Sequence, residues 1–169
     1  MRARTTLLYA LPLLLLLAAV TLGVLHGRPS DAGGGRRPLA LPPVEAPDAG
    51  GPACAGLLAA LPAELAATSG RLPREALAEP APPGALAWGG VDNGPVVLRC
   101  GLPRPAELAP GAAIVQVDGV GWLTLSEPDR DTFITVDRSV FVALTVPRGL
   151  GSGPVQTVSD VVRSALPGA

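Results

Sequence analysis

The first feature of the hydrophobic pattern is a long apolar run near the N-terminus. Residues Leu7 to Leu25 form a 19-residue segment without a charged side chain. As a helix, this segment would extend about 28 Å, close to the roughly 30 Å hydrocarbon core of a bilayer. A cleaved signal peptide is the alternative, but its apolar region is usually about 7–15 residues long and ends at a small-x-small site. The run is longer and lacks such a site, so we predict a single-pass transmembrane helix within residues 1–26.

The composition changes after the apolar run. Residues 27–52 are rich in glycine and proline and include Gly33-Gly34-Gly35, Pro42-Pro43 and Gly50-Gly51-Pro52. A segment of this kind buries too little apolar surface to offset the entropy that is lost on ordering. We predict a linker without a fixed fold over residues 27–52, followed by one α+β domain over residues 53–169.

The predicted domain begins with a helical pattern. Residues 53–67 carry a stripe of apolar side chains at helical spacing. The stripe consists of Leu57, Leu58, Leu61 and Leu65. Cys54 lies on the same face of the helix, and Pro62 is expected to end or kink it. Residues 68–85 are rich in turn-forming residues and are predicted as loop.

From residue 86 onward the pattern favours strands. A short candidate strand over residues 86–88 precedes an apolar, β-branched run over residues 96–101. Alternation places Val96, Leu98 and Cys100 on one face of this strand. Val97 and Arg99 then lie on the opposite face.

Hairpins and a final helix complete the expected fold. Asp118-Gly119 is a strong hairpin signal between strands 113–117 and 120–125. Asp137-Arg138-Ser139 separates strands 132–136 and 140–146 in the same way. Residues 154–166 have apolar side chains at helical spacing, at Val155, Val158, Val162 and Leu166. We therefore predict an antiparallel sheet of about five or six strands packed with two helices.

Composition narrows the possible functions. The formal net charge is −1, which gives no electrostatic reason to expect nucleic-acid binding. All 13 basic residues are arginine, and the one histidine, His26, precedes the predicted domain. The domain therefore offers no Ser–His or Cys–His pair, no P-loop lysine and no metal-ligand cluster. Four aspartates remain, but they lie at predicted turns, where Asp is favoured for local hydrogen bonding: Asp118, Asp129, Asp131 and Asp137. We expect no catalytic residue, no metal and no cofactor.

The two cysteines are candidates for a disulfide bond. Cys54 and Cys100 are 46 positions apart, a spacing that matches neither zinc nor thioredoxin-like motifs. Both occupy apolar-patterned positions in a chain that is expected to enter an oxidising space. We predict that they form one disulfide; two buried free thiols are the alternative. The arginines alone do not decide the orientation of the chain, because Arg2 and Arg4 before the apolar run are balanced by arginines after it. A disulfide forms outside the cytoplasm, so the two cysteines favour a cytoplasmic N-terminus.

Three further residues are candidates for contact with a partner. Arg99 is a charge in an otherwise apolar strand, and such a residue often lies on a solvated face. It could instead pair with a carboxylate such as Asp118 or Asp137, or meet an anionic partner. Trp88 and Trp122 are interpreted as core or sheet-face residues, with a partner-facing platform as the alternative.

Several of these residues together resemble a known family. They are the N-terminal anchor, Pro52-Ala53-Cys54 with the leucines that follow, Ala87-Trp88-Gly89, the run ending in Leu98-Arg99-Cys100-Gly101, and Trp122 after an Asp-Gly turn. The chain is similar to the uncharacterised actinobacterial membrane-protein family catalogued as domain of unknown function 3515. The resemblance implies a membrane-anchored protein and transfers no catalytic residue.

The sequence thus favours a membrane-anchored, extracytoplasmic, non-catalytic interaction or accessory module of the cell envelope. A lipid-binding or small-ligand-binding domain is the second hypothesis, and an unrecognised hydrolase is the third. An apolar pocket with converging polar groups would favour the second hypothesis, and a filled, convex core the first.

Overall fold

A computed structural model of the chain describes residues 37–89 and 94–168. The predicted anchor, Leu7 to Leu25, and the first part of the predicted linker lie outside these residues. No helix within the described ranges is long and apolar enough to cross a membrane. From Pro38 onward the chain belongs to one compact unit.

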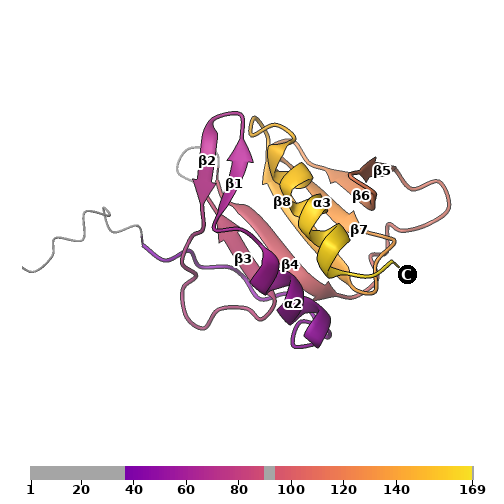
Figure 1. Cartoon of the computed structure of the whole chain (residues 1–169), viewed down its shortest axis with the longest axis horizontal. Coiled ribbons are helices and arrows are strands. Elements are labelled where there is room, and N and C mark those ends of the chain that lie inside the picture. The colour runs from indigo at the N-terminus through magenta and orange to yellow at the C-terminus, as the bar shows by residue number, and fades with distance from the viewer. Residues whose placement is uncertain (1–36, 90–93, 169) are drawn as a thin grey trace, which may run out of the picture. The chain divides into compact units, whose positions relative to one another are not determined.

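An antiparallel six-stranded sheet forms the centre of this unit (Figure 1). In spatial order its strands are β3 (Ala85–Trp88), β4 (Val96–Leu102), β8 (Phe141–Pro147), β7 (Arg130–Thr135), β6 (Val120–Ser126) and β5 (Ile114–Val117). A two-stranded sheet pairs β1 (Glu64–Ala67) with β2 (Gly70–Pro73). The helices are α2 (Pro52–Ala60) and α3 (Gly153–Ala165). The predicted antiparallel sheet with two helices and one disulfide is confirmed for the described residues.

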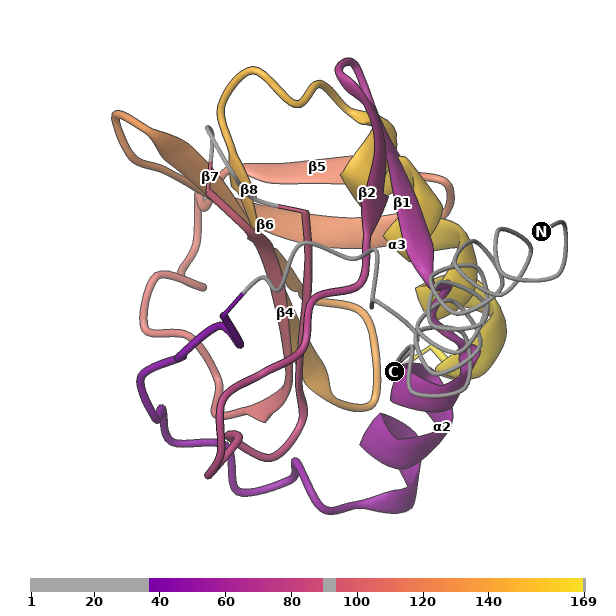
Figure 2. The ribbon, with the colours of Figure 1, turned by 90° about the vertical axis from the view of Figure 1, so that its left-hand side faces the viewer.

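One face of the six-stranded sheet carries Val96, Leu98 and Cys100, and we call it the inner face. Helices α2 and α3 lie on this side (Figure 2). The main hydrophobic core forms here, because the apolar sides of both helices and of the small hairpin meet the sheet. Its largest fully buried side chains include Leu57, Leu65, Trp88, Leu98, Trp122, Leu144 and Val158.

The opposite, outer face carries Val97 and Arg99. It is covered by irregular chain rather than by helices: the segment 38–50 and the loop 103–113 run along this side (Figure 2). A smaller cluster of Leu123, Ile134 and Ala143 packs there against loop residues such as Leu108 and Ala112. The two faces are therefore covered in physically different ways.

The predicted hairpins and the final helix are confirmed. Val117 pairs with Val120 across the Asp118-Gly119 turn. Asp118 has φ +50° and Gly119 has φ +79°, which is the left-handed conformation that a two-residue hairpin turn requires at both positions. The predicted apolar side chains of α3, and of Leu166 at its C-cap, are all buried. Local sequence patterns were therefore enough to predict the hairpins and the final helix.

The predicted helix over residues 53–67 is wrong in its second half. Helix α2 ends at Ala60, and Leu61 is already extended with ψ 138°. Pro62 explains this end, because a residue before proline is disfavoured in the helical region. Residues 64–73, predicted as helix end and loop, form the β1–β2 hairpin, in which the buried Leu65 pairs with Leu72.

The second half of the predicted linker is also not free of structure. Leu39 forms an isolated parallel bridge with Leu77, and its backbone N–H donates to Ala76. Ala49 is buried, and the backbone N–H of Asp48 donates to the carbonyl of Gly101 at 3.1 Å. The folded unit thus begins at Pro38 rather than at residue 53. Extended chain can pack without much apolar surface of its own when a sheet supplies the surface and the hydrogen-bond partners.

Candidate functional site

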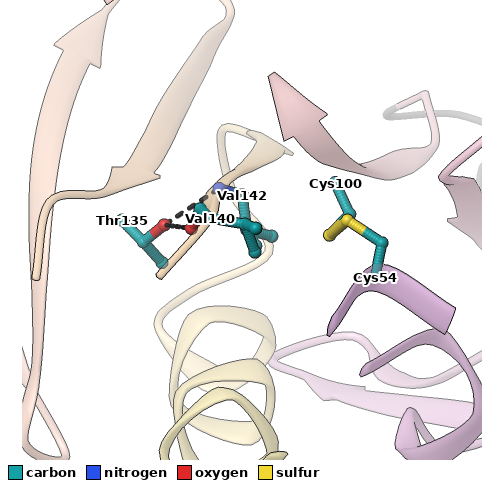
Figure 3. The surroundings of a disulfide bond; sticks show 5 residues. All are labelled: Cys54, Cys100, Thr135, Val140 and Val142. Atoms are coloured by element: carbon teal, nitrogen blue, oxygen red, sulfur yellow. Dashed lines mark hydrogen bonds between the residues drawn. A yellow bond between two sulfur atoms is a disulfide. The ribbon is translucent and has the colours of Figure 1, made fainter. Parts of the chain in front are cut away.

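The predicted disulfide joins the inner face to α2. Cys54 and Cys100 are bonded, with their Cα atoms 5.6 Å apart, and both side chains are fully buried (Figure 3). Close by, the Thr135 hydroxyl donates to the carbonyl of Val140 and accepts from the N–H of Val142, the residue paired with Cys100. The alternative of two free thiols does not hold. The disulfide is a structural element of the core and offers no reactive sulfur.

Both tryptophans also belong to the inner face. Trp88 is fully buried, its Nε1 donates to the carbonyl of Pro62 at 3.0 Å, and Arg74 lies over its ring. Trp122 is fully buried as well, and its Nε1 donates to Oγ of Ser159 at 2.9 Å. Buried rings with their polar atoms satisfied fill the core. The alternative that Trp88 or Trp122 faces a partner is therefore not supported.

Arg99 lies on the outer face, as alternation predicts. Its Nη2 donates to the carbonyl of Pro42 at 2.8 Å. Neither of the two carboxylates considered from the sequence is its partner, since Asp137 pairs with Arg138 and Asp118 forms the hairpin turn. Partial burial lowers the pKa of Arg99, because it removes water from the charged form. Of the three predicted partner-facing residues, Arg99 alone reaches the surface.

A groove opens on the outer face next to Arg99. It has a volume of about 620 Å³ and lies between the segment 39–41 and the adjoining ends of β4, β8 and β7. Val97 and Thr145, which pair across β4 and β8, form part of its lining. Val97 precedes Arg99 by two residues on the same strand face, and Pro42 directly follows the lining residue Leu41. Arg99 is not itself a lining residue, but it adjoins this side of the groove through Val97 and through Pro42, which accepts its hydrogen bond.

Charged side chains from the β6–β7 turn and from the residue after β8 form the other end. Arg130 donates two hydrogen bonds to Asp129, at 3.1 and 2.7 Å. Arg148 donates to the carbonyl of Glu127 and to Asp131. The hydrogen bond from Arg130 lowers the pKa of Asp129 and raises that of Arg130, so both remain charged. This end of the groove is polar and largely satisfied within the protein.

The run Leu98-Arg99-Cys100-Gly101 connects four parts of the molecule. Leu98 fills the core, Arg99 holds Pro42, and Cys100 holds α2. Gly101 has φ +86°, and a Cβ there would collide with the backbone of Ala49. The glycine is thus needed for the close passage of the chain that leads into α2.

Sequence reasoning missed the groove because one of its walls was predicted as linker. Leu39 and Leu41 line the groove from a Pro-rich segment. The signal that was available is their alternation, since Leu39-Ala40-Leu41 has the period of an extended, half-buried chain. The remaining lining residues come from three separate stretches that only the sheet topology brings together.

The comparisons with known proteins agree with the sequence motifs. A family model described as "Protein of unknown function (DUF3515)" matches residues 9–169. The chain belongs to this family. No curated protein and no solved structure matches it. Membership of the DUF3515 family confirms the predicted resemblance and assigns no activity, so the function has to be argued from the groove and its surroundings.

Proposed function

We propose that this DUF3515 protein is a non-catalytic interaction or accessory module of the cell envelope. In this proposal Leu7 to Leu25 anchor the chain in the membrane, and the domain from Pro38 onward lies outside the cytoplasm. The observation that carries the proposal is the groove on the outer face, which is placed beside a partly buried cation, Arg99.

The disulfide supports the extracytoplasmic placement. Structural disulfides form and persist in oxidising compartments and are rare in the cytosol. The Cys54–Cys100 bond is fully buried within the main core. Together with the 19-residue apolar run of the sequence, it favours a chain that crosses the membrane once with its N-terminus inside.

The surroundings of the aspartates favour binding over catalysis. A carboxyl group that acts as a general acid needs a raised pKa. Asp129, the aspartate in the groove, has a lowered pKa because Arg130 donates to it. Asp137 accepts from the backbone N–H of Gly121 and pairs with Arg138, which are structural roles. These contacts disfavour the third hypothesis, a hydrolase.

A lipid or small ligand is the second candidate for the groove. Its volume of about 620 Å³ lies within the range of small-molecule sites. However, the core behind the sheet is filled by large side chains such as Trp88 and Trp122, and the groove lies on the outer face beneath a single extended segment. This placement favours a segment of a larger partner.

Site-specific crosslinking in native membranes tests the proposal. A photoreactive amino acid at Thr145 places the probe in the groove, and the same amino acid at Ser164 places it on the exposed side of α3. We expect a discrete protein adduct from position 145 and none from position 164. Adducts with lipid alone would support the second candidate, and equal labelling at both positions would contradict a groove-specific partner.

Protease accessibility tests the topology. In cells stripped of their wall, external protease is expected to digest the domain from Pro38 onward. A domain that stays intact until the membrane is permeabilised would place it in the cytoplasm and overturn this part of the proposal. A protease site inserted after Gly111, an exposed loop position, gives the external protease a defined cleavage point in the folded domain.

A further inference from the structure

We propose that the groove binds an extended, acidic peptide segment and that Arg99 holds one of its carboxylates. This inference rests on the proposed function, because it names the chemistry of the partner at the same site. It is argued from the charge of Arg99, the distance between Arg99 and Arg130 along the sheet, and the nature of the groove lining.

The first argument is the unmatched charge of Arg99. Five other arginines in the described residues form ion pairs with carboxylates: Arg71, Arg130, Arg138, Arg148 and Arg163. Arg74 and Arg104, like Arg99, donate to backbone carbonyls instead, but Arg99 is the one beside the groove. Within the same described ranges, no carboxylate lies within ion-pair distance of Arg99, whose guanidinium donates to one backbone carbonyl. A guanidinium has five N–H donors, so most of those of Arg99 are available to a ligand. A partly buried cation without a counter-charge costs free energy that an incoming carboxylate would recover.

The second argument is the distance between Arg99 and Arg130 along β8. In the strand register Ala143 lies opposite Arg99, and Pro147 lies opposite Arg130. Four residue steps of β8 separate these positions, which is about 13 Å along the strand. An extended peptide of five residues spans these four steps, and its first and last side chains lie on the same face. Arg130 and Arg148, at the far end, already pair with Asp129 and Asp131, so the main charge match is made at Arg99.

The third argument is the lining between the two ends. Leu39, Leu41, Val97 and Pro147 supply apolar surface, and Thr145 supplies a hydroxyl. Alternating apolar side chains of a bound strand suit such a surface. The segment 39–41 forms the wall of the groove, and of its backbone groups only those of Leu39 take part in the bridge to the chain at Leu77. Backbone groups beyond Leu39 can therefore pair with an extended peptide but offer little to a fatty-acyl chain.

Peptide binding to the full chain in neutral-lipid nanodiscs tests this inference. The probe is acetyl-Glu-Val-Val-Val-Glu-amide, and the matched control is acetyl-Gln-Val-Val-Val-Gln-amide. We expect saturable binding of the acidic peptide and affinity at least about tenfold weaker for the neutral one, as the loss of a charge-assisted contact predicts. Arg99→Gln should remove this difference, whereas Arg163→Gln, a surface change on α3, should leave it intact.

A second variant tests the site while the Arg99 side chain is kept. Val97→Glu places a carboxylate beside Arg99 on the same strand face, where it should compete with the peptide and weaken binding by about tenfold or more. Equal binding of both peptides, or equal effects of Arg99→Gln and Arg163→Gln, would overturn the inference. Arg99-dependent binding of phosphatidylglycerol in the absence of peptide would also overturn it in favour of a lipid headgroup. If the crosslinks from Thr145 persist while the acidic peptide does not bind, the proposed function stands and only the peptide chemistry fails.

Discussion

The two faces of the six-stranded sheet differ in what covers them. On the inner face, α2, α3 and the β1–β2 hairpin bury Val96, Leu98 and Cys100 completely. On the outer face, Val97 and Arg99 of the same strand are only partly buried and lie beside a groove. Successive residues of β4 therefore serve two environments, because side chains alternate across a strand.

This contrast suggests that the inner face mainly stabilises the fold and the outer face mainly binds a partner. Helices can satisfy their own backbone groups, so they cover a face completely and exclude water. The extended segment 38–50 covers its face through a few hydrogen bonds and small contacts, and it leaves a groove beneath. Changes on the inner face should therefore cost stability, and changes on the outer face should cost mainly binding.

The largest expected effect comes from breaking the disulfide on the inner face. Cys54→Ser opens a loop that links α2 to β4 and should lower the free energy of unfolding by about 2–5 kcal/mol. Denaturant unfolding of the variant, compared with the oxidised protein, measures this loss. The reduced wild-type protein is the control and should lose a similar amount. A change below about 1 kcal/mol would show that the covalent link contributes little.

The next effect concerns the point where the chain passes from the outer side to α2. Gly101→Ala forces a side chain into a left-handed position, which costs about 1–2 kcal/mol. The new Cβ also collides with Ala49, for which overpacking adds about 1–3 kcal/mol. Gly111→Ala is a matched control, since Gly111 has φ +88° but no atom within 4 Å of an added Cβ. Equal losses in the two variants, measured by thermal unfolding, would show that the segment at Ala49 is not held against β4.

A smaller effect is expected from a buried hydrogen bond between α3 and the sheet. Ser159→Ala leaves Nε1 of the fully buried Trp122 without its partner and should cost about 1–3 kcal/mol. Ser164→Ala removes an exposed hydroxyl of the same helix that bonds to the carbonyl of Val161, and it should change stability by less than about 0.5 kcal/mol. Chemical denaturation of the pair measures the difference. Equal values would mean that Trp122 finds another acceptor.

The smallest expected effect on stability is at the outer face. Arg99→Ala removes one hydrogen bond to Pro42 and should lower the free energy of unfolding by about 1 kcal/mol or less. Hydrogen exchange of the Leu39 amide, which donates to Ala76, should report a local loosening of the segment 38–42. A loss of several kcal/mol would place Arg99 among the residues that hold the fold, and it would weaken the contrast between the two faces.

The sequence by itself determined the elements whose signals are local. The Asp118-Gly119 turn, the alternation along β4 and the apolar stripe of α3 each needed only neighbouring residues, and all three predictions are confirmed. The disulfide between Cys54 and Cys100 followed from the same periodicities, because they placed both cysteines on buried faces. Family membership followed from short motifs that these elements contain.

Only the tertiary structure decided the elements that depend on distant partners. Leu65 looks helical by its spacing, but Pro62 ends α2 and the pairing with Leu72 makes the segment a strand. The Pro-rich segment at Leu39 and Pro42 has no periodic signal strong enough to predict packing. Its partners are distant in sequence: Leu39 donates to the loop residue Ala76, and Pro42 accepts from Arg99 of the sheet. The groove exists because the sheet order brings β8 between β4 and β7, so that its lining is collected from separate parts of the chain. Local patterns report which face of an element is buried, but a site between elements depends on long-range pairing, which no local pattern encodes.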